Sequence, residues 1–149
     1  MGSWVEPEND GGFVGSVRPM IVRAGDFWFD AGDGRALMPD TDITKSYHAH
    51  VYYTPATRAA AEAVREGIES RFQVTMGRWR EEPVGPHPQS MYQVAFETDQ
   101  FDRLVPWLML NRQGLDVLVH PNTGESRTDH ETRALWLGQK LSLKLDGLD

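Results

Sequence analysis

The stretch at residues 46–53, with the sequence SYHAHVYY, predicts the β-strand around which the rest of the chain is organised. Tyrosine and valine favour strands, and Thr54-Pro55 ends this one. Because side chains alternate between the two faces of a strand, His48 and His50 point the same way, with Cα atoms about 6.6 Å apart. The two imidazoles are therefore close enough to bind one metal ion, while the alternate residues face the other side and can pack against helices.

Regular patterns continue downstream of this strand. The segment 56–71 is rich in Ala, Glu and Arg, with Thr54 as a suitable N-cap and Pro55 as a suitable first residue of a helix. The expected elements are a helix at 56–71, strands at 72–79 and 91–96, a helix at 101–111 and a strand at 115–119. This order predicts an α+β protein, a ferredoxin-like βαββαβ sandwich in which two helices cover one face of a four-stranded antiparallel sheet.

The positions of four histidines in this arrangement predict a metal site. We expect strands one and three to run parallel, with strands two and four running against them. The start of strand one, the connection between strands two and three, and the end of strand four would then share one edge of the sheet. His48 and His50, His87, and His120 occupy these three places. The alternative is that His48 and His50 are two solvated strand residues.

Composition limits the class of protein. A chain of 149 residues with 40% hydrophobic content suffices for one domain, which we expect at 44–149 behind an extended arm at 1–43. The net charge of −7 and the absence of a basic cluster disfavour nucleic acid as a partner. No apolar run or leader pattern indicates a membrane partner or export, so a cytoplasmic protein is expected. The chain has no cysteine, so any metal must be held by nitrogen and oxygen.

The segment 120–130 adds two carboxylates and a fifth histidine near the expected site. Glu125 or Asp129 could complete a set of two histidines and one carboxylate. The alternative is structural: Asp129 caps a short helix that runs through Trp136, and His130 lies on the surface. Cupins also carry a His-x-His strand, but their motif places a glutamate a few residues later, where this chain has Tyr53, Thr54 and Pro55.

Several spaced blocks of the sequence carry a resemblance to a known family. They are Tyr47-His48-Ala49-His50-Val51-Tyr52-Tyr53, Gly85-Pro86-His87-Pro88, Trp107-Leu108-Met109-Leu110-Asn111-Arg112, Leu115-Asp116-Val117-Leu118-Val119-His120-Pro121-Asn122-Thr123-Gly124 and Asp129-His130. Together they resemble the small DOPA 4,5-dioxygenase family, over residues 46 to 138 but not the tail at 141–149. The resemblance implies extradiol opening of a catechol ring, such as that of DOPA, by O₂ at a non-haem Fe(II), with Zn as a possible occupant of the purified protein.

The resemblance also suggests roles for individual residues. We expect His48, His50 and His120 to bind the metal, with Glu125 as a further candidate ligand. His87 would either replace one of these histidines or act with His130 in acid–base catalysis. For an amino-acid-like substrate, Arg112 is the first candidate to bind the carboxylate and Arg78 and Arg80 are alternatives, although Arg112 also suits a helix C-terminus. Tyr52 is expected on the open face of the sheet, together with Gln93; Tyr92 belongs more naturally to the core side.

An open sheet face that binds a metal and an aromatic substrate needs a cover. We expect a homodimer, or closure by the N-terminal arm or by residues 128–137. Two other functions remain open. In one, the same histidines bind Zn²⁺ for hydrolysis with Glu125 as the base. In the other, the chain is a dimeric ferredoxin-like module that binds a small molecule, and the histidines are incidental or hold a structural ion.

Overall fold

Five antiparallel strands form one sheet in residues 41–149, the part of the chain that the computed structural model describes. The strands are β1 (Ser46–Tyr52), β2 (Thr75–Met76), β3 (Met91–Glu97), β4 (Val117–Pro121) and β5 (Leu135–Leu137), in the spatial order β2-β3-β1-β4-β5. The α+β class and the antiparallel sheet are confirmed. The prediction of four strands is wrong, because β5 pairs with β4 and extends the sheet at one edge.

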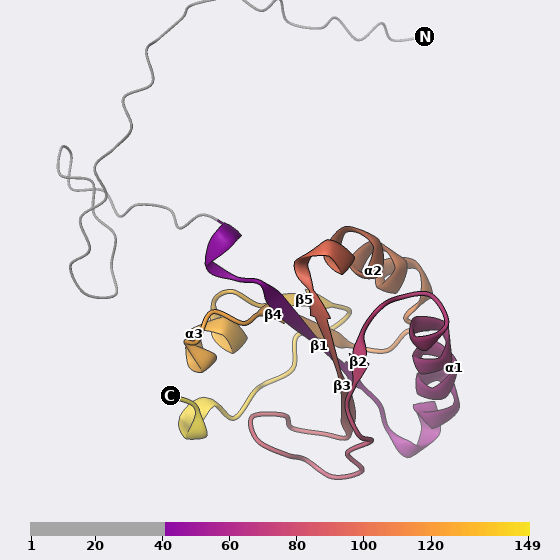
Figure 1. The fold of residues 1–149 in the computed structure, drawn as a ribbon. Coiled ribbons are helices and arrows are strands. Elements are labelled where there is room, and N and C mark those ends of the chain that lie inside the picture. The colour runs from indigo at the N-terminus through magenta and orange to yellow at the C-terminus, as the bar shows by residue number, and fades with distance from the viewer. Residues whose placement is uncertain (1–40) are drawn as a thin grey trace, which may run out of the picture. The chain divides into compact units, whose positions relative to one another are not determined.

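Two long helices cover one face of this sheet (Figure 1). They are α1 (Arg58–Glu69), which follows the 3-10 turn η2 (Pro55–Thr57), and α2 (Thr98–Asn111). A short helix, α3 (Ser126–Glu131), contacts β4, and the turns η1 (Thr41–Ile43) and η3 (Leu145–Gly147) lie near the two ends of the described segment. None of the helices in this segment is long and apolar enough to cross a membrane. The predicted arm falls on residues 1–40, outside the described residues, and on η1.

The main core lies between the sheet and the two long helices. From β1 it takes Ala49, Val51 and Tyr53, which alternate with the histidines as the strand pattern predicts. The helices contribute Ala61, Val64 and Ile68 from α1 and Leu104, Val105 and Leu108 from α2. Tyr92, Val94 and Phe96 of β3 face this side, and the Tyr92 hydroxyl donates to the Ala61 carbonyl at 3.1 Å. The opposite face of β1 is thereby left for His48, His50 and Tyr52.

The predicted strand directions are wrong in one respect. β1 pairs antiparallel with both β3 and β4, whereas strands one and three were expected to be parallel. The reason is topological: α1 returns the chain so that β2 runs with β1, and the following connection reverses it into β3. The connection between β2 and β3 consequently joins the sheet at the far end of β1 from His48. His87 cannot reach the other histidines by sharing their edge.

A second apolar cluster covers part of the open face. Tyr52, Met91 and Leu118 pack there against Trp136 of β5 and the C-terminal Leu141 and Leu143. The backbone N–H of Lys144 donates to the carbonyl of Pro86 at 2.9 Å and ties this tail to the β2–β3 connection. Trp136, which lies in the segment 128–137 that was expected to close the pocket, thus covers part of the open face, as does the tail, which was not predicted to do so; closure of a substrate pocket stays a prediction. The homodimer stays a prediction.

The main core predicts a contrast between two leucines of α2. Leu104→Ala should lower the free energy of unfolding by about 2–5 kcal/mol, because it removes a side chain that is fully buried and leaves a cavity. Leu110→Ala, at a position 85% exposed, should change it by less than about 0.5 kcal/mol. Urea denaturation of both variants measures the difference, and equal losses would contradict the placement of α2.

Candidate metal centre

All five histidines of the chain meet on the open face of the sheet. His48 and His50 come from β1, and the strand register places His48 directly opposite His120 of β4. The ring centroids of His48 and His120 lie 5.3 Å apart, and those of His50 and His120 lie 5.2 Å apart. His48, His50 and His120 each offer one nitrogen, and these three atoms lie within 4.8 Å of one another. The predicted set of three is therefore brought together.

The other two histidines arrive from outside the central strands. His87 belongs to the β2–β3 connection, and its ring centroid lies 4.1 Å from that of His50. His130 lies on α3 with its centroid 4.0 Å from that of His120, so it is not the isolated surface residue of the structural alternative. The β2–β3 connection joins the sheet at the end of β1 that lies far from His48. It then folds back over the open face, and His87 reaches the cluster for this reason.

Backbone carbonyls fix the protonation pattern of two of these rings. His120 donates from Nδ1 to its neighbour Pro121 at 2.8 Å, and His130 donates from Nδ1 to Ser126 at the same distance. Because a carbonyl oxygen only accepts hydrogen bonds, each Nδ1 must carry a proton. In the neutral rings Nε2 then holds the lone pair, and metal-binding histidines are commonly oriented in this way by their other nitrogen.

His50 occupies the centre of the cluster. It is only 2% exposed, and its Nε2 lies 3.1 Å from the Nε2 of His120. Two nitrogens bound to one ion at about 2.1 Å lie roughly 3.0–3.4 Å apart in octahedral or tetrahedral geometry, so this spacing suits two ligands of one metal. The Nδ1 of His50 is buried and has no hydrogen-bond partner among the described residues. Both observations fit a bound cation.

Tyr52 is the hydrogen-bond partner of His87. Its side chain is 1% exposed, stacks on Trp136 with ring centroids 5.9 Å apart, and places its hydroxyl 2.7 Å from the Nδ1 of His87. A hydroxyl can donate or accept, so His87, unlike His120 and His130, can carry its proton on either nitrogen. The predicted open-face position of Tyr52 is confirmed, but the side chain lies under a histidine and has little surface left for a substrate.

Burial keeps the cluster in its neutral form. Desolvation is the largest cause that lowers the pKa of His87 to about 4 and the pKa of His120 to about 4, with the nearby His130 contributing in both cases. Burial lowers the pKa of His50 and His48 as well, further for His50, which the other imidazoles surround. Neutral imidazoles are the form that binds a metal, so the cluster is ready to bind near neutral pH.

A buried carboxylate holds the loop that carries the fifth histidine. Asp129, 3% exposed, accepts from the backbone N–H and the hydroxyl of Thr123, both at 2.8 Å, and pairs with Arg133 at 3.1 Å. Arg133 also binds Glu125 at 2.6 Å. The expected helix cap is wrong, since Asp129 lies inside α3, which ends at Glu131. Glu125 is engaged by Arg133, and neither carboxylate belongs to the histidine groups.

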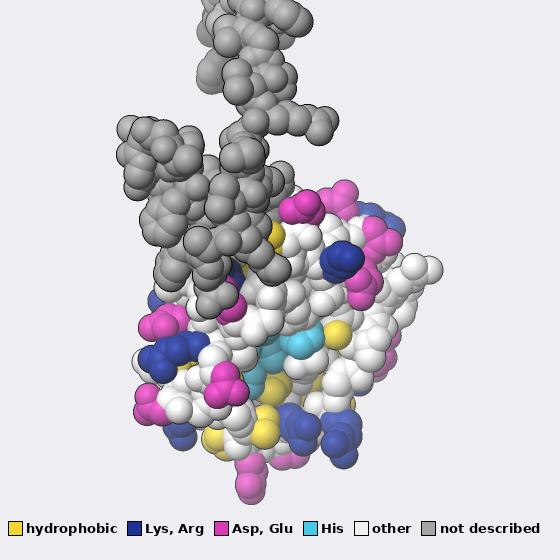
Figure 2. Space-filling model, turned by 60° about the vertical axis from the view of Figure 1, so that its left-hand side comes forward, with side chains coloured by type: hydrophobic (Ala, Val, Ile, Leu, Met, Phe, Trp, Pro, Cys, Tyr) yellow, Lys and Arg dark blue, Asp and Glu magenta, His cyan; other side chains and the backbone are white. Residues whose placement is uncertain are grey.

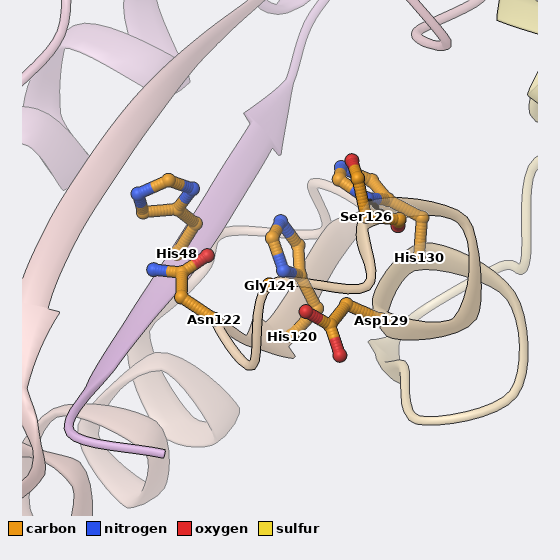
Figure 3. A pocket seen from close by; sticks show the side chains of 7 residues that line it. All are labelled: His48, His120, Asn122, Gly124, Ser126, Asp129 and His130. Carbon is orange, nitrogen blue, oxygen red and sulfur yellow. Dashed lines mark hydrogen bonds between the residues drawn. The ribbon is translucent and has the colours of Figure 1, made fainter. Parts of the chain in front are cut away.

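Cavities adjoin the cluster in several places, including one of about 360 Å³ that His48 lines together with residues of β3. A cavity of about 240 Å³ is lined by His48, His120 and His130, and Figure 3 shows these three side chains around it together with Asp129. Another, of about 280 Å³, is lined by His87 together with Arg78, Arg80 and Gln93. Histidine side chains reach the molecular surface in Figure 2, so the cluster is accessible to small molecules.

The arginines expected to bind a carboxylate fall in different places. Arg112 follows α2 and donates to the carbonyl of Leu115, just before β4 begins, whereas His120 lies near the end of that strand. The structure therefore supports the role of Arg112 as a helix C-terminal residue and not its role in binding a substrate carboxylate. Arg78 faces the cavity of His87, and within residues 41–149 its guanidinium forms no hydrogen bond or ion pair.

Sequence reasoning missed Arg133, although its i,i+4 spacing from Asp129 is a pattern that indicates an ion pair on a helix.

The lowered pKa values predict an acid-sensitive fold. In the metal-free protein, the free energy of unfolding should be constant above pH 6.5 and should fall between pH 6.5 and about 4, because the unfolded histidines bind protons that folded His87 and His120 exclude. The His87→Asn, His120→Asn variant should show a shallower fall. Urea denaturation at several pH values checks this, and parallel curves for the two proteins would contradict it.

The carboxylate that holds the loop predicts a second contrast. Asp129→Asn should lower the free energy of unfolding by roughly 1–3 kcal/mol, because Arg133 loses a buried partner. Glu131→Gln is the control in the same helix: its ion pair with Arg127 is exposed, 3.6 Å long, and contributes about 0–1 kcal/mol. Thermal and urea denaturation measure both. A loss no larger for Asp129→Asn than for Glu131→Gln would argue against the role given to Asp129.

Comparisons with known proteins show which family this chain resembles over most of its described length. The Dopa 4,5-dioxygenase family matches residues 47–147, so the match continues into the tail that the sequence resemblance left out. A DOPA 4,5-dioxygenase from Amanita muscaria is 30% identical over 89% of this chain and 65% of its own length. An uncharacterised 21.2 kDa protein from Botryotinia fuckeliana is 36% identical over 71% of this chain and 64% of its own length.

A solved structure is similar as well. The crystal structure of a candidate dioxygenase from Nostoc punctiforme superposes with a TM-score of 0.73 at 54% sequence identity, covering 73% of this chain and 95% of that one. The chain spans slightly less than two thirds of the length of the two curated relatives. With a match over residues 47–147, the chain belongs to the Dopa 4,5-dioxygenase family.

Proposed function

We propose that this protein is a dioxygenase that opens the ring of a catechol, such as DOPA or a related dihydroxyphenyl compound, with O₂ and a non-haem Fe(II). The observation that carries the proposal is the convergence of five imidazoles, three of them buried, beside a cavity, in a chain of the Dopa 4,5-dioxygenase family. His48, His50 and His120 would hold the iron. When bound, iron supplies the redox chemistry that activates O₂ towards the catechol.

The ligand count suits this reaction. Three protein ligands leave about three of six positions for the two catechol oxygens and O₂. The cavity beside His48 and His120 has a volume of about 240 Å³, enough for a single aromatic ring. In the reaction a ring C–C bond breaks and both atoms of O₂ enter the product, so no external reductant is needed.

Other residues would bind the substrate and move protons. A catechol must lose its hydroxyl protons as it binds to a metal, and His87 can accept one because the Tyr52 hydroxyl serves either tautomer. The guanidinium of Arg78, which has no ion pair within residues 41–149, suits a substrate carboxylate at the edge of the cavity that His87 lines. A buried site of this kind also excludes bulk water from the reacting groups.

The hydrolase alternative has less support. Hydrolysis at Zn²⁺ needs a general base next to the metal-bound water, and Glu125 was the candidate. Its carboxylate instead pairs with Arg133 at 2.6 Å, and the described histidine groups include no other carboxylate. Zinc remains a suitable occupant of an all-nitrogen site, so the metal that supports turnover distinguishes the two functions.

The decisive experiment reconstitutes the protein with Fe(II) under anaerobic conditions and then adds O₂ and a catechol. DOPA, caffeate and protocatechuate are tested with an oxygen electrode and by absorbance. We expect uptake of one O₂ per catechol and a yellow ring-opened product with at least one of them. His120→Ala should reduce the rate by about 100-fold or more, since a metal ligand is lost, while Glu131→Gln retains it. No O₂ uptake with any catechol would refute the proposal.

A further inference from the structure

We propose that the five histidines form two overlapping sites for a single divalent cation, with His50 common to both. The first site is His48–His50–His120, the set used in the proposed function, on which this inference builds. The second is His50–His87–His130. In each set the three candidate ligand atoms lie within 4.8 Å of one another, so modest side-chain movements would bring either set around an ion with bonds of about 2.1 Å.

The second set is as well prepared for a metal as the first. The Nδ1 of His130 is held by the Ser126 carbonyl at 2.8 Å, and the Nδ1 of His87 lies 2.7 Å from the Tyr52 hydroxyl. The His130 ring therefore keeps Nε2 for a ligand, and the His87 ring does so when its Nδ1 donates to the Tyr52 hydroxyl; a ring held through its other nitrogen is typical of metal-binding histidines. By contrast, no hydrogen bond to the imidazole of His48 occurs in residues 41–149, although His48 belongs to the first set.

His50 links the two sets. Its Nε2 lies 3.1 Å from His120, a member of the first set, and its ring lies 4.1 Å, centroid to centroid, from His87, a member of the second. The buried Nδ1 of His50 has no partner among the described residues. A buried nitrogen without a hydrogen-bond partner costs free energy. A cation bound by His50 would therefore provide an interaction that hydrogen bonds within the described residues do not provide.

Charge argues against two ions bound together. Neither histidine set includes a carboxylate, and the carboxylate that lines a cavity with His120 and His130 is that of Asp129. Asp129, next to His130 in sequence, has its oxygens engaged by Thr123 and Arg133. Two divalent cations sharing one imidazole would repel each other four times as strongly as two unit charges at the same distance, and the charge of the neighbouring Asp129 carboxylate is already paired with Arg133. One ion with two available positions satisfies both geometry and charge.

The two positions differ in what lies beside them. His48 and His120 line the cavity of about 240 Å³, together with Asn122, whereas His87 lines the separate cavity of about 280 Å³ with Arg78 and Gln93. An ion that moves between the two sets therefore changes the cavity in which its open positions are available to a ligand. His130 lines the first cavity but belongs to the second set of ligands, so it binds the ion only when the ion occupies the second position.

The test is metal binding by matched double variants, without catechol or turnover. Wild type, H48A/H120A, H87A/H130A and H120A/H130A are freed of metal and titrated with Zn²⁺ by calorimetry, and the bound metal is counted by mass spectrometry. The first two variants each destroy one set and leave the other whole, and the third breaks both sets. Circular dichroism establishes that each variant is folded before it is titrated.

We expect one equivalent in the wild type and in the first two variants, with both variants binding about twofold more weakly when the two positions have equal affinity, because each variant keeps one of two positions. H120A/H130A should bind about 100-fold more weakly or not at all. If H48A/H120A fails to bind while H87A/H130A binds like the wild type, only the first position exists; the proposal is then wrong, and the proposed function is untouched. Two equivalents in the wild type would also overturn it.

Crystals of the wild type grown with Zn²⁺ provide a measurement that does not depend on the variants. Anomalous scattering should show zinc at both positions with occupancies that add up to about one, as expected for two positions that exclude each other. Zinc at a single position with full occupancy would contradict the proposal even if every variant failed to fold.

Discussion

The register of β1 between β3 and β4 is the constraint on which the site depends. Ala49 is paired with Val94 on one side and Val119 on the other, and these three side chains belong to the core beneath the helices. The same register places His48 opposite His120 on the other face. Because side chains alternate with a period of two, a slip of one residue would move the histidines into the core and expose the apolar residues. The free energy that fixes the metal centre is thus mainly hydrophobic burial on the opposite side of the sheet.

The sequence predicted the central part of this arrangement. The His48-x-His50 pattern, the apolar alternation around it and the helix signals of α1 and α2 are local, so they survive without knowledge of the tertiary structure. The C-terminal elements were not predictable in this way: β5 has three residues and forms only because β4 offers a free edge. The tail at Leu141 and Leu143 likewise has no periodic pattern and owes its position to the apolar surface around Tyr52.

The site shows the same division between local and tertiary signals. His87 was expected in the cluster for the wrong reason, since the strand directions assumed for its edge were incorrect; it arrives because its connection folds back and is tied to the tail through Pro86 and Lys144. Arg112 had the better sequence argument for substrate binding but lies by Leu115, at the end of β4 remote from His120. Pairings across the fold, such as Tyr52 with His87, leave no pattern in the linear sequence.

The absence of a carboxylate among the described histidine groups follows from where the acids find their partners. Asp129 and Glu125 are close in sequence to His130, yet Arg133 engages both, and Thr123 satisfies the remaining capacity of Asp129. Both carboxylates are engaged by Arg133, and each of the two histidine groups offers a metal nitrogen donors alone. Such a centre keeps the full positive charge of its ion, which favours an anionic ligand such as an ionised catechol. The ion pairs of α3 therefore influence the chemistry of the site without touching the metal.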